Sequence, residues 1–175
     1  MVAKMVTSKR SWSVPVAVHD IPETGRRFDL VADEAARDAV AALIGLRALP
    51  QLRAALDVMR HGRDGLHVAG TVLARVGQTC VITLEPIEND IEAPVDLVFA
   101  PTREKTAATS TDAPEPLING TVDLGAVATE FLVLAVDPYP RKQGAVFEPP
   151  PTADTGAHPF AALAALKKGR GGADK

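Results

Sequence analysis

The stretch NGTVDLGAVATEFLVLAVDPYP, residues 119–140, decides the fold because it contains the longest apolar segment of the chain. Asp123 is placed to cap a helix, since its carboxylate can accept hydrogen bonds from the free amides of the first turn. Apolar side chains then recur at helical spacing along one face, at Leu124, Val127, Phe131 and Leu134. Three further apolar residues cover the other faces, namely Leu132, Val133 and Val136. The pattern predicts a buried helix that stops at Asp137-Pro138, because proline lacks the amide needed to continue it.

Length and composition fit one globular domain with additional mobile segments. The chain has 175 residues, of which 46% are hydrophobic but only 4% aromatic, so its core must rest on aliphatic side chains. The net charge of −3 gives no whole-molecule attraction to nucleic acid or to an anionic membrane. The single cysteine excludes an intrachain disulfide, and no stretch approaches the roughly 20 apolar residues of a membrane span. We therefore expect a cytoplasmic protein in a reducing compartment, without membrane contact.

The first third of the chain shows short strand patterns and one amphipathic helix. Strands are predicted at residues 13–18 and 27–31, separated by a turn cluster at residues 21–25. Asp33 is placed to cap a helix, and Gly45 is placed to end it. The apolar positions of this helix are Ala36, Val40, Leu43 and Ile44.

From residue 49 the apolar pattern alternates, as in half-buried strands. One face of the first strand carries Leu52, Ala54, Leu56 and Val58. The sequence HGRDG, residues 61–65, predicts a tight hairpin because Asp-Gly accommodates positive φ angles. The return strand places Leu66, Val68, Val72 and Val76 on one face. Gly77-Gln78 then predicts a turn, and strands are predicted at residues 79–85 and 92–100, with Pro86 as the break between them.

Hairpin-linked strands in succession favour an α+β fold, in which an antiparallel sheet that could curl toward a barrel carries two main helices. We expect the domain to span residues 1–140, with the polar residues 101–116 as a flexible loop. Residues 141–157 are predicted to form a proline-rich linker and residues 158–168 a short helix on this flexible arm. So short a helix is marginal alone, and it must dock on its own domain or on a partner.

One arrangement of residues could carry nucleophilic chemistry. Cys80 with His61 or His67, which flank the same hairpin, would make a thiol-dependent hydrolase or part of a metal site. However, Cys80 alternates in phase with Ile82 and Leu84, and this pattern favours a small packed core residue. No catalytic residue is therefore predicted.

Charged residues give weaker indications. An acidic cluster could hold a hard cation or perform acid–base work, but its position around Pro86 favours a solvated turn; it comprises Glu85, Glu88, Asp90 and Glu92. Glu130, the only charge inside the apolar helix, either faces solvent or pairs with an arginine such as Arg75 or Arg141.

Basic residues gather in small groups that could contact phosphate, although each also fits a solvated face. The groups of interest are Arg60, Arg63 and Arg75 around the hairpin, and Lys167, Lys168 and Arg170 in the tail. The sequence shows no aromatic-rich platform for stacking single-stranded RNA.

Three blocks in order resemble the YceD family of large ribosomal RNA subunit accumulation proteins. They read QTCVITLEPIEND (78–90), INGTVDLGAVATEFLVLAVDPYPR (118–141) and HPFAALAALKKG (158–169). The positions that match the family pattern are Cys80, Leu84, Glu85 and Pro86, then Asp123, Leu124, Glu130 and Leu134, then Pro159, Phe160, Leu163 and Leu166. Many members carry further cysteines, some of which resemble a zinc site, whereas this chain has Cys80 alone. It therefore predicts no metal and no cofactor.

The resemblance implies a non-enzymatic factor for accumulation or processing of large-subunit ribosomal RNA. We expect an adaptor that binds ribosomal RNA, a ribosomal protein or an assembly protein, with protein contact favoured by the low net charge and scarce aromatics. No small-molecule substrate is expected. Two alternatives stay open: the Cys80 hydrolase, and a regulatory binding module unrelated to ribosomes.

Overall fold

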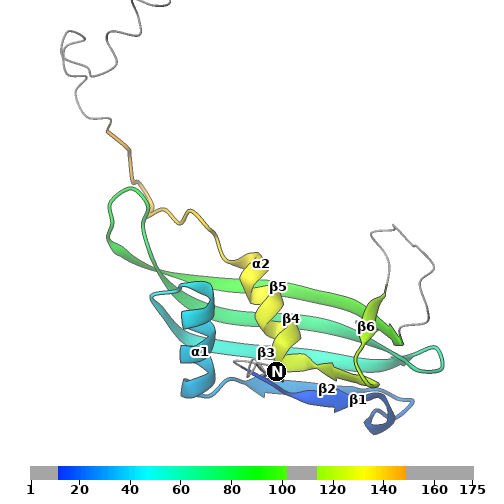
Figure 1. Ribbon diagram of the computed structural model, residues 1–175. Coiled ribbons are helices and arrows are strands. Elements are labelled where there is room, and N and C mark those ends of the chain that lie inside the picture. The colour runs from blue at the N-terminus through cyan, green and yellow to red at the C-terminus, as the bar shows by residue number, and fades with distance from the viewer. Residues whose placement is uncertain (1–11, 102–113, 149–175) are drawn as a thin grey trace, which may run out of the picture. The chain divides into compact units, whose positions relative to one another are not determined.

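The computed structural model describes residues 12–101 and 114–148. The chain divides into two units, Met1–Gln143 and Gly144–Lys175. The helices and strands of the described ranges lie in the first unit and combine a sheet with two helices, as an α+β fold (Figure 1). Residues 149–175 lie outside the described residues, and so do the predicted helix at residues 158–168 and most of the predicted linker.

The main sheet has five strands in the order β2-β3-β4-β5-β6. Neighbours from β2 to β5 run antiparallel, whereas β6 pairs parallel with β5. The strands are β2 (Arg26–Val31), β3 (Ala48–His61), β4 (Gly65–Thr79), β5 (Pro86–Pro101) and β6 (Glu115–Leu117). The predicted curl toward a barrel is wrong, because β2 and β6 are separate edges of this open sheet within the described residues.

A smaller sheet joins the N-terminal part of the chain to the start of the second helix. It pairs β1 (Pro15–Ala17) with β7 (Thr121–Asp123), and a short 3-10 helix, η1 (Val18–Asp20), follows β1. The predicted flexible loop overlaps regular structure at both ends, since Pro101 closes β5 and Glu115 opens β6. The loop's residues 102–113 are outside the described ranges.

The β3–β4 hairpin follows the sequence pattern closely. Its strands pair from His61↔Gly65 to Gln51↔Arg75, and the predicted inward sets on β3 and β4 are buried. The positive φ of the connecting turn lies at Gly62, at +62°, and not at Asp64-Gly65, on which the prediction rested. A local turn signal and period-two burial were therefore sufficient to predict this element.

Helix α1 (Glu34–Ile44) has the predicted ends. Asp33 accepts a hydrogen bond from the Ala36 amide at 2.8 Å, and Gly45 ends the helix in the left-handed conformation at φ +70°. Val40 is fully buried, and the helix packs on β3.

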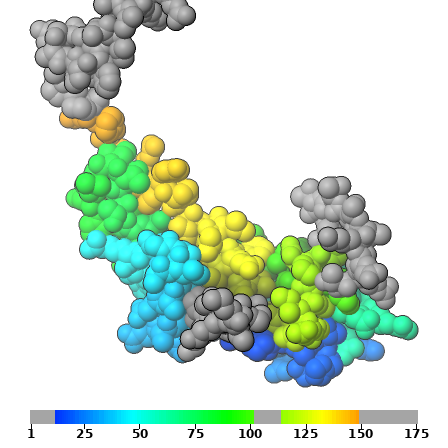
Figure 2. Space-filling view, viewed as in Figure 1, coloured from blue at the N-terminus to red at the C-terminus, as the bar shows by residue number. Residues whose placement is uncertain are grey.

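Helix α2 (Leu124–Ala135) is capped by Asp123 as predicted, but it is buried on one side only. Leu124, Val127 and Leu132 enter the core, whereas Leu134 is 81% exposed and Val133 44% exposed. The prediction of burial on nearly every face is wrong, because α2 crosses one face of the sheet and nothing in the described chain covers its outer side (Figures 1 and 2). The helix ends at Ala135, before the predicted stop at Asp137-Pro138.

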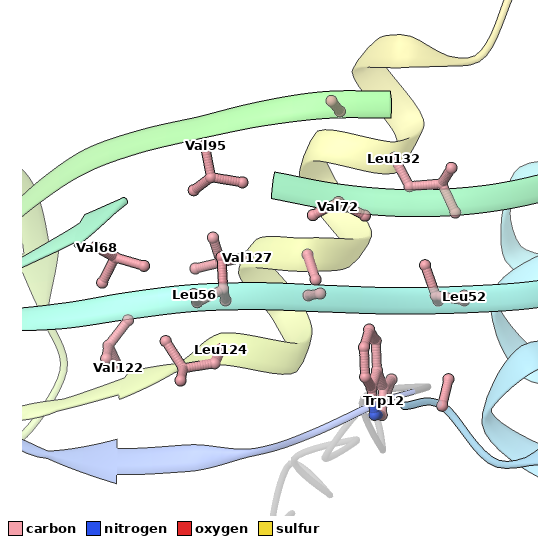
Figure 3. Packing of buried hydrophobic residues seen from close by; sticks show 14 of the residues in the cluster. Trp12, Leu52, Leu56, Val68, Val72, Val95, Val122, Leu124, Val127 and Leu132 are labelled. Carbon is pink, nitrogen blue, oxygen red and sulfur yellow. The ribbon is translucent and has the colours of Figure 1, made fainter. Parts of the chain in front are cut away.

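The core lies between α2 and the inward face of the sheet. Figure 3 shows Leu124, Val127 and Leu132 of α2 facing aliphatic side chains of the central strands, with Trp12 closing one side. The central-strand residues labelled there are Leu52, Leu56, Val68, Val72 and Val95. As the composition predicts, aliphatic residues form most of the core.

The sequence interpretation fails between residues 77 and 86. Strand β4 continues through Gly77-Gln78, where a turn was predicted, and residues 80–85 form the turn, where a strand was predicted. The register places Thr79 opposite Pro86, so Pro86 begins β5. Proline is tolerated at the first residue of a strand, which explains why it does not break this one.

Candidate functional site

Residues 80–85, which we call the Cys80 turn, connect β4 to β5. The Cys80 amide donates to the Glu85 carbonyl at 2.9 Å, and the Leu84 amide donates to the Cys80 carbonyl at 3.0 Å. Leu84 adopts φ +59° and is 76% exposed, so the turn presents a leucine side chain in a left-handed backbone conformation. The Cys80 side chain, by contrast, is buried.

The Cys80 sulfur is an acceptor for two backbone amides. The Thr83 N–H donates to Sγ at 3.4 Å from within the turn, and the Lys142 N–H donates at 3.3 Å from a segment 62 residues away. The thiol therefore links the Cys80 turn to the segment that follows α2, in addition to packing in the interior.

The segment of residues 137–142 lies along the Cys80 turn and the end of β4. The Val81 amide donates to the Pro140 carbonyl at 2.9 Å, and the Gln78 side-chain amide donates to the Asp137 carbonyl at 2.8 Å. Lys142 Nζ lies 2.9 Å from a Glu85 carboxylate oxygen. Together with the hydrogen bond from the Lys142 amide to the Cys80 sulfur, four contacts thus hold the 137–142 segment in place.

These contacts change the proton affinities of the groups involved. The Lys142 amide, followed by the Thr83 hydroxyl and amide, lowers the pKa of Cys80 from 9.0 to about 6, although burial acts in the opposite direction. The hydrogen bond with Lys142 lowers the pKa of Glu85, and the same bond raises the pKa of Lys142. These hydrogen bonds therefore favour the thiolate form of Cys80, which is a stronger acceptor than a thiol.

The geometry does not assemble the Cys80 hydrolase. His61 and His67 lie beside the β3–β4 hairpin, and Cys80 follows the opposite end of β4, roughly 40 Å away at the usual strand rise. His67 instead contacts Asp96 on β5 at 2.7 Å. Across residues 12–101 and 114–148, no three His, Cys, Asp or Glu side chains are grouped closely enough to hold a metal ion.

Asp123 joins α2 to the N-terminal part of the chain. The buried Asp123 carboxylate accepts from the Ser13 hydroxyl at 2.7 Å and the Val14 amide at 2.8 Å, besides capping α2 through Gly125 and Ala126. A side chain at Gly125 would come within 2.8 Å of the Trp12 carbonyl oxygen, so glycine permits this close approach. Asp123 thus has a positioning role across the fold.

A groove of about 630 Å³ runs beside the outer side of α2, and we call it the α2 groove. Its apolar part includes Leu97 and Phe99 of β5, Ile118, and Phe131 and Leu134 of α2. Glu130 also lines it and is exposed, so of the two predicted alternatives Glu130 faces solvent. Figure 2 shows α2 open to solvent between the α1 and β6 regions. The groove brings together Asp123, Glu130 and Leu134, three positions that are expected from the sequence to match the family pattern.

The predicted basic group at the hairpin does not form one patch. Arg60 and Arg63 lie at the hairpin, where Arg60 Nε donates to the Ile21 carbonyl at 2.6 Å. Arg75 lies near the other end of β4 and forms a two-pronged ion pair with Asp90, at 2.8 and 3.1 Å. That pair raises the pKa of Arg75 and lowers the pKa of Asp90. Lys167, Lys168 and Arg170, like Pro159, Phe160, Leu163 and Leu166, lie outside the described residues.

The acidic cluster is solvated as expected, but most of it lies on a strand. Glu88, Asp90 and Glu92 alternate along the outward face of β5, while Glu85 belongs to the Cys80 turn. Sequence reasoning missed Pro140 and Lys142 as partners of the Cys80 turn, and Gln78 as a partner of Asp137. The available signal was Gln78, a polar residue in phase with the buried positions of β4.

Comparisons with known proteins give one match. The family model described as "Large ribosomal RNA subunit accumulation protein YceD" matches residues 68–167, more than half of the chain. The matched region includes the Cys80 turn, Asp123 and the part of α2 that lines the groove. No curated protein and no solved structure matches the chain. On the strength of the family match, the chain belongs to the YceD family of large ribosomal RNA subunit accumulation proteins.

Proposed function

We propose that this protein supports the accumulation of large-subunit ribosomal RNA as a non-catalytic assembly factor in the cytoplasm, acting as an adaptor that binds a protein partner. The observation that carries the proposal is the family match over residues 68–167. In the ranges that the structure describes, no helix is long and apolar enough to cross a membrane.

The placement of the family-pattern residues supports a binding role. Cys80, Asp123 and Leu124 are buried and position other segments, whereas Leu84, Glu130 and Leu134 are exposed. Buried residues of this kind maintain a scaffold, and an exposed leucine that lines a groove with other apolar residues, as Leu134 does, is typical of a contact surface. Arg60 and Arg63, together with the tail residues Lys167, Lys168 and Arg170, are candidates for additional contact with RNA phosphates.

The proposal is tested by removing the gene from its native host and measuring the ratio of large- to small-subunit ribosomal RNA. We expect the ratio to fall and to recover with the wild-type gene. A chain lacking residues 158–175 tests the docking role proposed for the tail and should restore the ratio incompletely. An unchanged ratio in the deletion strain would contradict the proposed function. Full recovery with the truncated chain would contradict only the docking role of the tail.

A further inference from the structure

We infer that the α2 groove binds a basic, amphipathic helix of a partner protein. The inference rests on the proposed function and deepens it by assigning the contact to one surface and one class of partner. Leu134, Phe131 and Ile118 would receive the apolar side of that helix, and Glu130 and Glu115 would pair with its lysines or arginines.

The apolar part of the groove is unusually open for aliphatic side chains. Leu134 is 81% exposed and Ile118 is 63% exposed, and both line the same concave surface. Phe131 is partly buried and Phe99 is buried, so packed aromatic side chains line the groove together with the exposed Leu134 and Ile118. A concave apolar surface beside a helix suits another helix, whose side chains at i, i+3, i+4 and i+7 enter it.

The charge of the groove selects the partner. The acidic residues that line it are Glu115, Asp123 and Glu130, and no Lys, Arg or His of the described chain lines it. Asp123 is engaged in capping α2, so Glu115 and Glu130 are left at the surface. A phosphate backbone would meet the negative charge of Glu115 and Glu130 here, with no cation among the described residues of the lining, whereas lysines beside an apolar stripe would be attracted. The electrostatics favour a basic protein segment over RNA.

The adjacent sheet edge argues against strand addition as the binding mode. Strand β6 is an edge of the main sheet, but it has three residues and the middle one, Pro116, has no amide to donate. An extended peptide added to this edge would lack a backbone hydrogen bond at its centre. A helix makes no such demand, because its backbone groups are satisfied internally.

The test uses the full chain and a fluorescent 18-residue model peptide with leucines at i, i+3, i+4 and i+7 and lysines between them. Fluorescence anisotropy compares it with a peptide in which glutamates replace the lysines, and with a single-stranded RNA oligonucleotide. Leu134→Ser should weaken binding of the basic peptide by about tenfold, the scale of a central apolar contact. Glu130→Gln should weaken it about threefold and reduce its salt dependence.

Matched controls come from surfaces outside the groove. Leu43 is 66% exposed on α1, so Leu43→Ser removes a comparable leucine, and Glu92→Gln removes a comparable charge from β5. Both variants should bind the basic peptide like wild type. The inference would be overturned if Leu43→Ser weakened peptide binding as much as Leu134→Ser does. It would also be overturned if the basic and acidic peptides bound equally well, or if the protein bound RNA and Leu134→Ser abolished that binding. Sedimentation showing self-association that Leu134→Ser abolishes would do the same, since a second copy would then occupy the groove.

The ribosomal RNA assay separates this inference from the proposed function. If deletion of the gene lowers the RNA ratio and Leu134→Ser fails to restore it while Leu43→Ser does, both are supported. If Leu134→Ser restores the ratio fully, the groove inference fails and the proposed function stands. If deletion leaves the ratio unchanged but peptide binding depends on Leu134, the groove inference is supported and the proposed function fails.

Discussion

The two turns at the ends of β4 are built in different ways. The turn at residues 61–65 follows from its own sequence, since Gly62 supplies the positive φ and the paired strands continue directly from it. The Cys80 turn contains no glycine, and its form depends on backbone and side-chain contacts with residues 137–142. Local chemistry is sufficient for the first turn, whereas the second requires a segment that is distant in the sequence.

The two helix caps show the same contrast. Asp33 accepts from Ala36 within its own helix, whereas Asp123 caps α2 and also accepts from Ser13 and Val14. In both pairs the long-range member lies within residues 68–167, the region that the family model matches. Long-range contacts of this kind fix the relative positions of segments, which local contacts cannot do.

Loss of a helix cap should give the largest difference in stability between the local and the long-range member of a pair. Among the described residues, Asp123→Ala removes an acceptor from four donors, and it should lower the free energy of unfolding by about 3 kcal/mol. Asp33→Ala should cost about 1 kcal/mol, as is usual for a helix cap. Urea unfolding followed by circular dichroism measures both. Asp123→Asn, which keeps one acceptor oxygen, should recover part of the loss. Equal losses for the two alanine variants would contradict the contrast.

A substitution in each turn should show how far along the chain hydrogen exchange depends on that turn. Cys80→Ala removes the acceptor for the Thr83 and Lys142 amides, so hydrogen exchange should accelerate at Thr83 and also at Lys142. We expect a change on the order of tenfold, consistent with the loss of hydrogen bonds of ordinary strength.

Gly62→Ala is the matched control at the other end of β4. A side chain there meets nothing within 4 Å, so the cost is backbone strain of about 1 kcal/mol at a left-handed position. Faster exchange should stay near residues 61–65. Exchange at Lys142 that is unchanged by Cys80→Ala would mean that the sulfur does not hold the 137–142 segment.

The same contrast explains what the sequence could predict. Asp33, Gly45 and the HGRDG turn act within a few residues, and period-two burial identified the inward faces of β3 and β4. The Cys80 turn was misread because Cys80, Ile82 and Leu84 alternate as a strand would, while its partners lie about 60 residues further on. Leu134 was assigned to the core because a leucine at a contact surface and a leucine in a core look alike in sequence. The sequence pattern grouped Arg75 with Arg60 around the hairpin. The structure separates the two arginines because β4 is a long strand and they lie near its opposite ends.

Stability should depend on pH through Cys80. The pKa of Cys80 is lowered from 9.0 to about 6 in the folded protein, so between these values the unfolded chain binds more protons than the native one. The free energy of unfolding should therefore rise as the pH increases from 6 to 9, and this contribution should disappear as the pH falls through 6.

Urea titrations of wild type and Cys80→Ala at pH 6, 7.5 and 9 measure this contribution. The stability difference between the two should widen as the pH rises, because the variant lacks the thiolate. Gly62→Ala provides the comparison, since its difference from wild type should stay constant over the same range. A constant difference for Cys80→Ala would show that the sulfur stays protonated in the folded state.

The ion pair between Lys142 and Glu85 should contribute least. Both side chains are about half exposed, at 52% and 51%, and ion pairs of this kind contribute little because water and salt screen them. Lys142→Gln removes the ammonium group but keeps the backbone amide that donates to Cys80. We expect the melting temperature to fall by about 2 °C or less, and the difference to vanish in 1 M salt. Exchange at the Lys142 amide should stay slow, in contrast to its acceleration in Cys80→Ala. A fall as large as that caused by Cys80→Ala would mean that the charged side chains, and not the sulfur and the backbone, hold the Cys80 turn against residues 137–142.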